Sequence, residues 1–482
     1  MRHPEILQGG MGVGVSGWRL ARAVSKAGQL GVVSGTALDV QLVRRLQLGD
    51  RDGHLRRSLA RFPNVDLVAR VLARYYRADG PAAGRRFTEL PLPTVELSAA
   101  RAELMVLGSF VEVDLAREGH DGVVGINLLE KIQIPTLAVL YGALLARVDY
   151  VLMGAGIPLE IPAILDRLAR HEPVSLTIDV GGDAAGVSTQ THFDPATIGA
   201  GSDPLLRPFF FPIVSAFSLA QMLLRRAGGR IDGFVVEAPS AGGHNAPPRG
   251  PLQLDDAGQP IYGARDEVDL QKLRTLGVPF WLAGRRGGPG QLQEARALGA
   301  AGIQVGTAFA FCAESGLTPE LRRAVLDQVA SGRVTVHTDP LASPTGFPFK
   351  VVQLGGTLSD PEVFASRRRA CNMGYLRKAY RRSDGRIGYR CPAEPVADYV
   401  RKGGSEADAF GRKCLCNALA ANVGLAQALP GREPEKPMLT AGDALDALGA
   451  LLDAAGPDYT AADVLAMLAA PVRAAEIELA AR

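Results

Sequence analysis

Residues 279–307 read PFWLAGRRGGPGQLQEARALGAAGIQVGT, two short apolar runs joined by a helical pattern. The runs are Pro279–Ala283 and Gly302–Gly306, and glycine stands at or just beyond the end of each. Gly290–Leu298 between them has the spacing of an amphipathic helix. Continuous apolar runs linked by a helix predict parallel strands with a helical crossover.

The same alternation runs through the first 306 residues of the chain and gives eight candidate strands. Helical patterns separate several of them, and Ser16–Ala27 is a clear example because its apolar residues recur near one face. Eight strands alternating with helices predict an α/β fold, a TIM-type (β/α)8 barrel. The expected strands are Glu5–Gln8, Gly31–Ser34, Val123–Asn127, Tyr150–Met153, Phe210–Ser215, Gly233–Glu237, Pro279–Ala283 and Gly302–Gly306.

Two long insertions interrupt the barrel pattern. Residues 36–122 have helical character, whereas residues 174–206 contain two alternating stretches, Val174–Val180 and Val187–Phe193. Alternation on both sides of a glycine-rich turn predicts a β-hairpin that extends from the barrel.

The chain continues beyond the last expected strand. We expect a barrel of residues 1–315 with the two insertions, and a C-terminal lid and mainly helical lobe of residues 316–482. Ala441–Gly456 and Ala461–Ala480 are rich in Ala and Leu and are expected to be helices. Residues 339–350 are rich in proline and glycine and form either a cap over the active site or a surface loop.

A glycine-rich turn follows the first expected strand. Residues 8–17, QGGMGVGVSG, contain Gly12-x-Gly14-x-x-Gly17, which matches the dinucleotide-binding pattern of a Rossmann fold. That fold also requires an acidic residue at the end of its second strand to bind the ribose. The second strand here ends in Ser34. The turn therefore favours a backbone platform, on which glycines let the main chain approach a flat ring closely.

Glycines also end the last two expected strands. Gly284, Gly287 and Gly288 follow the seventh strand, and Gly306 and Thr307 follow the eighth. In TIM barrels these two loops often bind phosphate through free backbone N–H groups. Thr307 adds a hydroxyl group. The two loops predict an anion site, since ordinary turns would not need glycine in both.

One histidine falls at the catalytic face. Residues 237–244, EAPSAGGH, end the sixth strand with Gly242, Gly243 and His244. The carboxyl ends of the strands form the catalytic face of a TIM barrel. A histidine there is expected to act as a general acid or base near neutral pH. Lone histidines are usually structural, so the glycine pair and the strand end are what single out His244.

These segments resemble the nitronate monooxygenase (2-nitropropane dioxygenase) family and the related flavin enoyl reductases of fatty-acid and polyketide synthesis. They occur in the family's order and span about residues 5–315. The most specific part is the Ala-Gly-Gly-His run followed by the Gly-Thr strand end. The matching segments are Gln8–Gly12, Gly125–Leu128, Met153–Pro158, Ala241–His244 and Gly302–Phe309.

The resemblance implies FMN, bound noncovalently, as the cofactor. It implies that Met11 and the adjacent glycine backbone lie against the flavin, that Asn127 hydrogen-bonds its ring, and that His244 faces the substrate. Such a flavin performs the electron chemistry, while the protein positions it and the substrate. The implied cofactor-binding residues are Gln8, Gly9, Gly10, Met11, Gly12, Asn127, Gly242, Gly243, Gly284, Gly287, Gly288, Gly306 and Thr307.

Two reactions follow from the resemblance. A nitronate monooxygenase-like enzyme oxidises an alkyl nitronate or similar anion with oxygen to a carbonyl compound and nitrite, without NAD(P)H. The alternative is an FMN- and NAD(P)H-dependent enoyl reductase that acts on acyl thioesters, with His244 orienting the acyl group. A noncatalytic flavin- or phosphate-binding protein is a third class, which a histidine on the catalytic face disfavours.

The chain departs from the shorter monooxygenases. His244 is followed by Asn245-Ala246-Pro247-Pro248 rather than by the usual glycine, and the insertions and C-terminal lobe are additional. These features resemble the longer, polyketide-associated branch. They imply an acyl carrier protein or CoA thioester as a partner, beside a small-molecule substrate and oxygen.

Four cysteines, Cys371, Cys391, Cys414 and Cys416, fall in the C-terminal lobe. Four thiols can bind zinc or an iron–sulfur cluster. Their spacings are wide and lack the C-x2-C pair of zinc sites, so thiols that pack the lobe are favoured. The basic stretch that begins at residue 367 can face a CoA phosphate or an acidic carrier protein, but a solvated helix face fits it better.

Composition excludes several classes of function. The 482 residues carry a formal net charge of +3, which is too small to recruit nucleic acid. The long apolar stretch of residues 137–164 contains Arg147, Asp149 and Glu160, so it is not expected to cross a membrane. Five cysteines without an apparent secretory signal predict free thiols and a cytoplasmic location.

Overall fold

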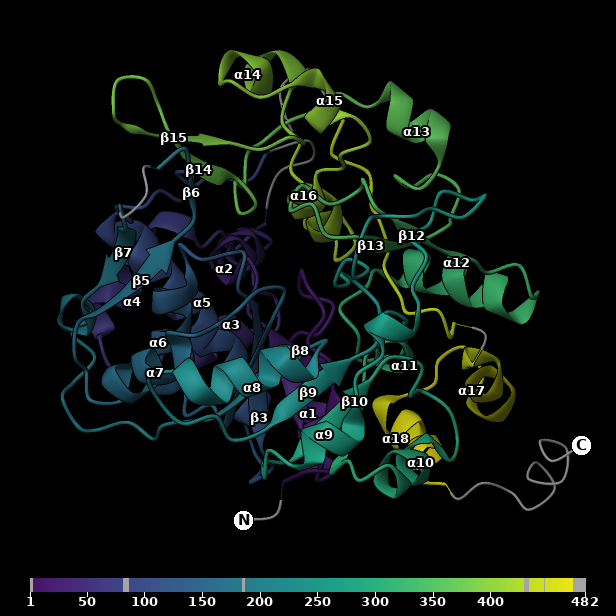
Figure 1. The fold of residues 1–482 in the computed structure, drawn as a ribbon. Helices are drawn as coiled ribbons and strands as arrows, with labels where there is room; N and C mark the ends of the chain where they lie inside the picture. The colour runs from purple at the N-terminus through teal and green to yellow at the C-terminus, as the bar shows by residue number, and fades with distance from the viewer. Residues whose placement is uncertain (1–2, 81–85, 184–186, 429–432, 446, 471–482) are drawn as a thin grey trace, which may run out of the picture.

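Eight parallel strands form a barrel at the centre of the molecule (Figure 1). The computed structural model describes residues 3–80, 86–183, 187–428, 433–445 and 447–470. The strands are β1 (Ile6–Gln8), β2 (Gly31–Ser34), β3 (Val124–Leu129), β4 (Tyr150–Gly154), β8 (Phe209–Val214), β9 (Phe234–Glu237), β10 (Phe280–Ala283) and β11 (Gly302–Val305). All eight predicted strands are confirmed, with ends that differ by at most a residue or two.

The barrel closes between β1 and β2. The strand order is β1-β11-β10-β9-β8-β4-β3-β2, and every neighbouring pair is parallel. Leu7 bridges Leu30 across the remaining seam, where the Gln8 amide donates to the Leu30 carbonyl at 2.9 Å. The TIM-type barrel is therefore confirmed, and a Rossmann sheet, which is open, is excluded.

Large apolar side chains fill the barrel interior. Trp281 stacks on Phe211 with ring centroids 4.7 Å apart, and both side chains are fully buried. Tyr150 packs edge-on against Phe211, and the Trp281 ring nitrogen donates to the carbonyl of Pro4. Side chains of alternate strand residues point inward and pack in layers, so the lower barrel is a solid core rather than a pore.

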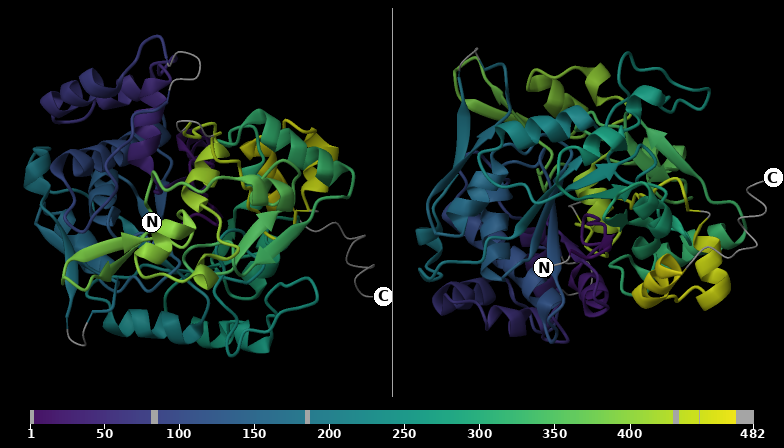
Figure 2. Two further views of the ribbon diagram at one scale, coloured as in Figure 1. Left: turned by 90° about the horizontal axis from the view of Figure 1, so that it is seen from above. Right: turned by 60° about the horizontal axis from the view of Figure 1, so that its bottom comes forward.

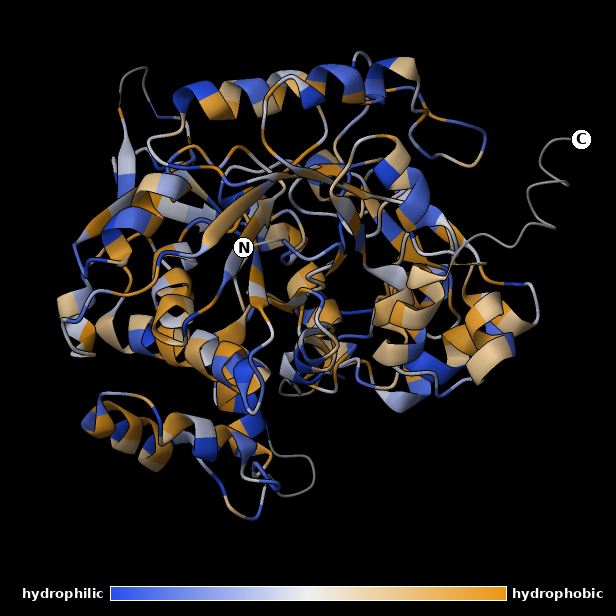
Figure 3. Cartoon of the chain, turned by 90° about the horizontal axis from the view of Figure 1, so that it is seen from below, coloured by the Kyte–Doolittle hydropathy of each residue, from blue (hydrophilic) through white to orange (hydrophobic). Residues whose placement is uncertain are grey.

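Helices surround the strands. The first insertion supplies four of them, and α5 serves as the crossover from β2 to β3. α6 packs closely against α5 because Gly142 has no side chain; a Cβ there would stand 2.2 Å from the Val106 carbonyl oxygen. Figure 3 shows hydrophobic and hydrophilic residues mixed along the helices at the outside of the barrel. These helices are α1 (Trp18–Lys26), α2 (Leu38–Gln47), α3 (His54–Leu59), α4 (Val65–Tyr75), α5 (Ala99–Arg117), α6 (Thr136–Leu145), α7 (Ile161–Leu168), α8 (Phe217–Arg226), α9 (Leu270–Arg274), α10 (Gln291–Ala297) and α11 (Thr307–Ala310).

The second insertion forms the predicted hairpin. β5 (Val174–Ile178) and β7 (Thr189–Phe193) pair in antiparallel register, and residues 184–186 of the predicted turn lie outside the described residues. The intervening β6 (Val180–Gly181) pairs with β14 (Lys378–Arg381), which pairs with β15 (Ile387–Arg390). The hairpin is thereby joined to the C-terminal region.

Most of the C-terminal region lies over the carboxyl ends of the strands, above the barrel in Figure 1, and much of it is seen on the right in the left view of Figure 2. Its last two helices, residues 448–455 and 461–469, lie beside the barrel near α10. Its residues 439–445 extend over the barrel, and the predicted helix 441–456 begins only at Leu448. Residues 471–480 of the other predicted helix lie outside the described residues, and the boundary at residue 315 stays a prediction. The elements are α12 (Pro319–Ala330), β12 (Val336–Asp339), β13 (Phe349–Val352), α13 (Pro361–Ser366), α14 (Val396–Arg401), α15 (Glu406–Ala409), α16 (Leu415–Ala421), α17 (Leu448–Ala455) and α18 (Ala461–Ala469).

Among the described residues, no helix combines the length and apolar character that a membrane span needs.

Candidate active site

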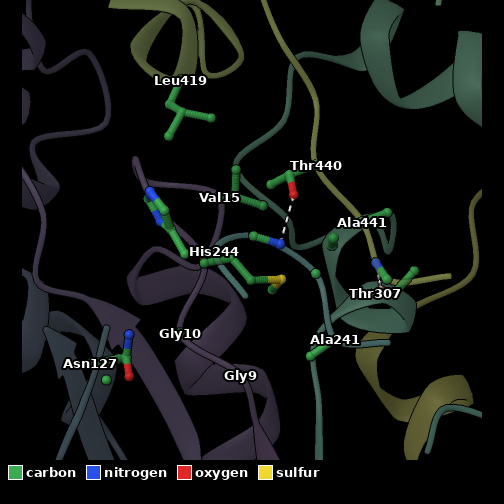
Figure 4. A pocket seen from close by; sticks show the side chains of 18 of the residues that line it. Gly9, Gly10, Val15, Asn127, Ala241, His244, Thr307, Leu419, Thr440 and Ala441 are labelled. Atoms are coloured by element: carbon green, nitrogen blue, oxygen red, sulfur yellow. Dashed lines mark hydrogen bonds between the residues drawn. The ribbon is translucent and has the colours of Figure 1, made fainter. Parts of the chain in front are cut away.

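A cavity of about 240 Å³ opens at the carboxyl ends of the barrel strands. Its floor comes from the barrel, and its cover comes from the C-terminal region (Figure 4). Most residues that the sequence predicted for the site line this one cavity, although they come from distant parts of the chain. They are Gly9, Gly10, Met11, Gly12, Asn127, Gly242, Gly243, His244, Gly284, Gly287, Gly306 and Thr307.

The glycine-rich turn after β1 forms part of the floor. A Cβ at Gly10 would stand 2.2 Å from the Cβ of Asn127, so the turn can pass Asn127 only because this position has no side chain. The Asn127 amide lines the cavity and has no hydrogen-bond partner among the described residues. The turn thus places bare backbone beside an unpaired amide, which suits a flat polar ring.

Two predicted residues do not line the cavity. Gln8 is fully buried within the barrel wall, where its Oε1 accepts from the Val32 amide at 2.9 Å. Its side chain therefore links β1 to β2 at the seam, and only its backbone precedes the glycine turn. Gly288 lies just beyond the lining residue Gly287, and no atom stands within 4 Å of a Cβ built on it.

The predicted anion end is closed by the C-terminal region. The Gly442 amide donates to the Thr307 Oγ1 at 2.8 Å, and the Asp443 amide donates to the Ser240 carbonyl at 3.1 Å. The Thr307 hydroxyl still has its own proton to donate. Arg285 also lines the cavity and has no ion-pair partner in the described part of the chain. This end presents backbone amides, a hydroxyl and a cation, which suit a phosphate.

His244 is held from the loop between β12 and β13. Its Nε2 lies 2.7 Å from the Ser343 Oγ, which lies 2.8 Å from the Thr345 Oγ1, and Phe349 packs edge-on against the ring. The hydroxyl pair satisfies either neutral tautomer, because each hydroxyl can donate or accept. The backbone is fixed as well, since the Gly243 amide donates to the Thr440 Oγ1 at 2.8 Å (Figure 4).

Two ionisable groups in the cavity have displaced pKa values. Burial lowers the pKa of His244 to about 4 and raises the pKa of Glu237 to about 8. No hydrogen-bond partner of the Glu237 carboxyl group lies in the described ranges. Desolvation therefore keeps both groups largely uncharged at neutral pH. The expectation that His244 titrates near neutral pH is wrong, and its catalytic role stays a prediction.

The outer wall of the cavity is apolar. It consists of side chains from β13, from the segment around residue 375 and from α16, so a substrate that passes this wall meets hydrocarbon before it reaches His244. Figure 4 shows Leu419 on the far side of His244 from Asn127. The wall residues are Phe349, Met373, Leu376, Leu415 and Leu419.

Sequence reasoning missed several lining residues. The cap by residues 339–350 was one of two open interpretations, and Phe349 in the cavity together with Ser343 on His244 supports it. Nothing in the sequence indicated Thr440–Gly442, which lie about 130 residues beyond the last barrel strand. Glu237 stands at a strand end, and that position was the available signal.

No family model matches this chain, and no curated protein matches it. Three solved structures are similar at low identity. FabK from Thermotoga maritima is 15% identical, with coverage of 97% of this chain and 92% of that chain and a TM-score of 0.47. Nitroalkane oxidase from Streptomyces ansochromogenes is 18% identical, with coverage of 99% and 97% and a TM-score of 0.46. The enoyl reductase domain of MlnA from the macrolactin biosynthesis cluster of Bacillus amyloliquefaciens is 13% identical, with coverage of 75% and 66% and a TM-score of 0.38.

Proposed function

We propose that this protein is an FMN-dependent oxidoreductase of the nitronate monooxygenase and flavin enoyl reductase type. The observation that carries the proposal is the cavity itself, where a glycine floor, an unpaired amide, an anion end and a neutral histidine meet at the carboxyl ends of the strands. Catalytic sites of TIM barrels are built at this face.

The residues present fit FMN. Asn127 has an unpaired amide on the floor, and Gln304 contributes a buried Oε1 that lacks a partner among the described residues. Buried polar atoms are normally satisfied, so the unpaired Gln304 oxygen beside the open Asn127 amide supports a polar ligand in this cavity. In this proposal the floor holds the flavin ring, and Arg285 and Thr307 hold the phosphate. When bound, the flavin supplies the electron transfer.

His244 orients the substrate in this proposal. Its Nε2 is engaged by Ser343, and no partner of its Nδ1 lies in the described ranges. A neutral imidazole with a proton on Nδ1 can donate a hydrogen bond to a substrate oxygen without carrying charge. Because its pKa is about 4, His244 is a poor proton acceptor at neutral pH and a better hydrogen-bond donor.

The apolar outer wall favours the enoyl reductase reaction. An α,β-unsaturated acyl thioester has a hydrocarbon chain for the wall and a carbonyl oxygen for His244. NAD(P)H and a proton then reduce the double bond, and NAD(P)⁺ is released. Oxidation of an alkyl nitronate is the second candidate, because the His244 Nδ1 has no partner among the described residues and can donate to a nitronate oxygen as well as to an acyl carbonyl. Acyl carrier protein or CoA is the corresponding thioester partner.

The test begins with the flavin of the purified protein, identified by absorbance and mass. NAD(P)H oxidation with enoyl thioesters, and oxygen uptake with nitrite release from alkyl nitronates, are then measured in parallel. Enoyl-dependent NAD(P)H oxidation that is lost in His244→Ala supports the first reaction. NAD(P)H-independent nitrite release supports the second.

Two results and one control discriminate further. A protein that binds FMN but turns over neither substrate class, in wild type and variant alike, belongs to the noncatalytic class. A protein that binds no flavin even after reconstitution contradicts the whole proposal. The control is Cys312→Ser, because this buried thiol bonds to the Phe309 carbonyl and lies outside the cavity.

A further inference from the structure

Four thiols from separate parts of the C-terminal region surround a second, smaller hollow. Cys371 follows α13, Cys391 follows β15, and Cys414 and Cys416 stand at the start of α16. All four line this hollow, together with Glu394 and Arg377. None of them forms a disulfide, although Cys391 and Cys414 are buried and lie in one packed cluster. The fold therefore brings together four cysteines that are widely spaced in the sequence.

Hydrogen-bond donors stand beside three of these thiols. The backbone amide of Ala393 faces Cys391, that of Asn417 faces Cys414 and that of Leu376 faces Cys416. The Asn417 side-chain amide also donates to the Cys414 Sγ at 3.4 Å.

Charged side chains of both signs stand at the same hollow. Arg377 and Glu394 line it, and Arg369 lies close enough to Cys391 and Cys414 to interact with them. These arginines belong to the basic stretch that was expected to be a solvated helix face. Arg369 lies in an irregular segment, and Arg377 lies just before β14. Because neither residue is in a helix, the expectation of a solvated helix face is wrong.

Burial opposes this arrangement. Burial raises the pKa of each of the four thiols, because a thiolate without a countercharge is costly to desolvate. A metal that binds thiolate supplies the missing positive charge and displaces the protons. The amides and arginines then hydrogen-bond and neutralise the anionic centre, as they do around iron–sulfur clusters.

We propose that Cys371, Cys391, Cys414 and Cys416 hold an iron–sulfur cluster. Among the described residues, no three His, Cys, Asp or Glu side chains are arranged to hold a single metal ion. Thiols that stand around a hollow are the arrangement that a cluster requires, because its own iron and sulfide atoms separate the ligands. Four cysteines without other ligands are the usual set for such a cluster.

The cluster would stand directly beside the candidate active site. Met373, Leu376, Leu415 and Cys416 line both the thiol hollow and the larger cavity, so a single layer of side chains separates them. One cluster ligand, Cys416, belongs to that shared wall. The inference does not depend on the reaction proposed above, because the thiols, amides and arginines are independent of any flavin.

The experiment measures iron, acid-labile sulfide and zinc in the full-length protein purified without oxygen. We expect about four iron and four sulfide per chain, and an electron paramagnetic resonance signal of the cluster after reduction with dithionite. Cys391→Ser and Cys414→Ser should lose most of the iron, whereas Cys312→Ser, at a buried thiol outside the hollow, should keep it. Circular dichroism and flavin content establish that each variant is folded.

Two results would overturn the proposal. One is stoichiometric zinc without iron or sulfide, which would make the centre a tetrathiolate zinc site. The other is a folded, flavin-loaded wild type that takes up neither iron nor sulfide during anaerobic reconstitution. Iron K-edge absorption of the wild type tests the ligands without any variant, because thiolate and sulfide neighbours give a sulfur-only first shell.

Discussion

His244 and Glu237 give the flavin-free protein two opposing dependences of stability on pH. The folded-state pKa of His244 is about 4, below the ordinary value of about 6.5, so its contribution is present above pH 6.5 and is lost as the pH falls toward 4. The folded-state pKa of Glu237 is about 8, above the ordinary value of about 4.3, so its contribution is present at low pH and is lost as the pH rises through 8.

The two contributions nearly cancel in the wild type. Between about pH 7 and pH 5, linkage gives a loss of roughly 2 kcal/mol from His244 and a gain of roughly 2–3 kcal/mol from Glu237. Each single variant removes one side of this balance. Between pH 7 and pH 5, the free energy of unfolding of His244→Gln should rise by roughly 2–3 kcal/mol, because only the Glu237 contribution remains. That of Glu237→Gln should fall by roughly 2 kcal/mol, because only the His244 contribution remains.

The assay is urea denaturation of the flavin-free wild type, the two variants and the double variant at both pH values. Other titrating groups are common to all four proteins, so differences between them isolate the two sites. If the free energy of unfolding changes with pH by the same amount in the wild type and in His244→Gln, the pKa assigned to His244 is refuted. Changes of the opposite sign would refute the burial that underlies both shifts.

Three further outcomes follow from the site. Gly10→Ala forces a Cβ within 2.2 Å of the Asn127 Cβ and should cost about 1–3 kcal/mol of stability and weaken flavin binding; adding Asn127→Gly, which removes that Cβ, should restore part of the stability, and a single variant as stable and as tight-binding as the wild type would contradict the clash. Asp443→Asn removes the ion-pair partner of the buried Lys350 ammonium, 2.6 Å away, and should lower the free energy of unfolding in urea by about 2–3 kcal/mol. Adding Lys350→Met should recover part of that loss, and an unchanged urea midpoint in Asp443→Asn would show that the ion pair is dispensable. Ser343→Ala removes the hydroxyl that holds the His244 ring and, if the proposed function is right, should lower kcat about 10-fold with little change in KM; equal turnover in wild type and variant would mean that the hydroxyl does not position the ring.

The strands could be predicted because each barrel strand is a short apolar run that ends in a glycine or polar turn. Glycines of the floor and the anion end could be predicted for a related reason, since they lie in the turns that follow the strands. In a parallel barrel all strand ends meet at one face, so residues placed at strand ends are brought together by the topology alone.

The cover of the site could not be predicted in the same way. Ser343 lies among Ser, Pro and Thr residues in an irregular segment, and nothing local marks it as the partner of His244. The protonation of His244 was predicted wrongly because its desolvation arises partly from Phe349, which packs against it from far along the chain. The arrangement of the thiols around one hollow could not be predicted for the same reason, since only the fold brings Cys371 and Cys391 to Cys414.

The extended residues 439–445 have a consequence for biosynthesis. They reach the barrel through the bonds from Gly442 to Thr307 and from Gly243 to Thr440, near the end of the chain. A nascent polypeptide on the ribosome can therefore close its eight strands long before it possesses a finished cavity. Until residues 439–445 have been translated, this part of the barrel mouth lacks its cover, and Thr307 and the Gly243 amide lack the partners that they have in the folded protein.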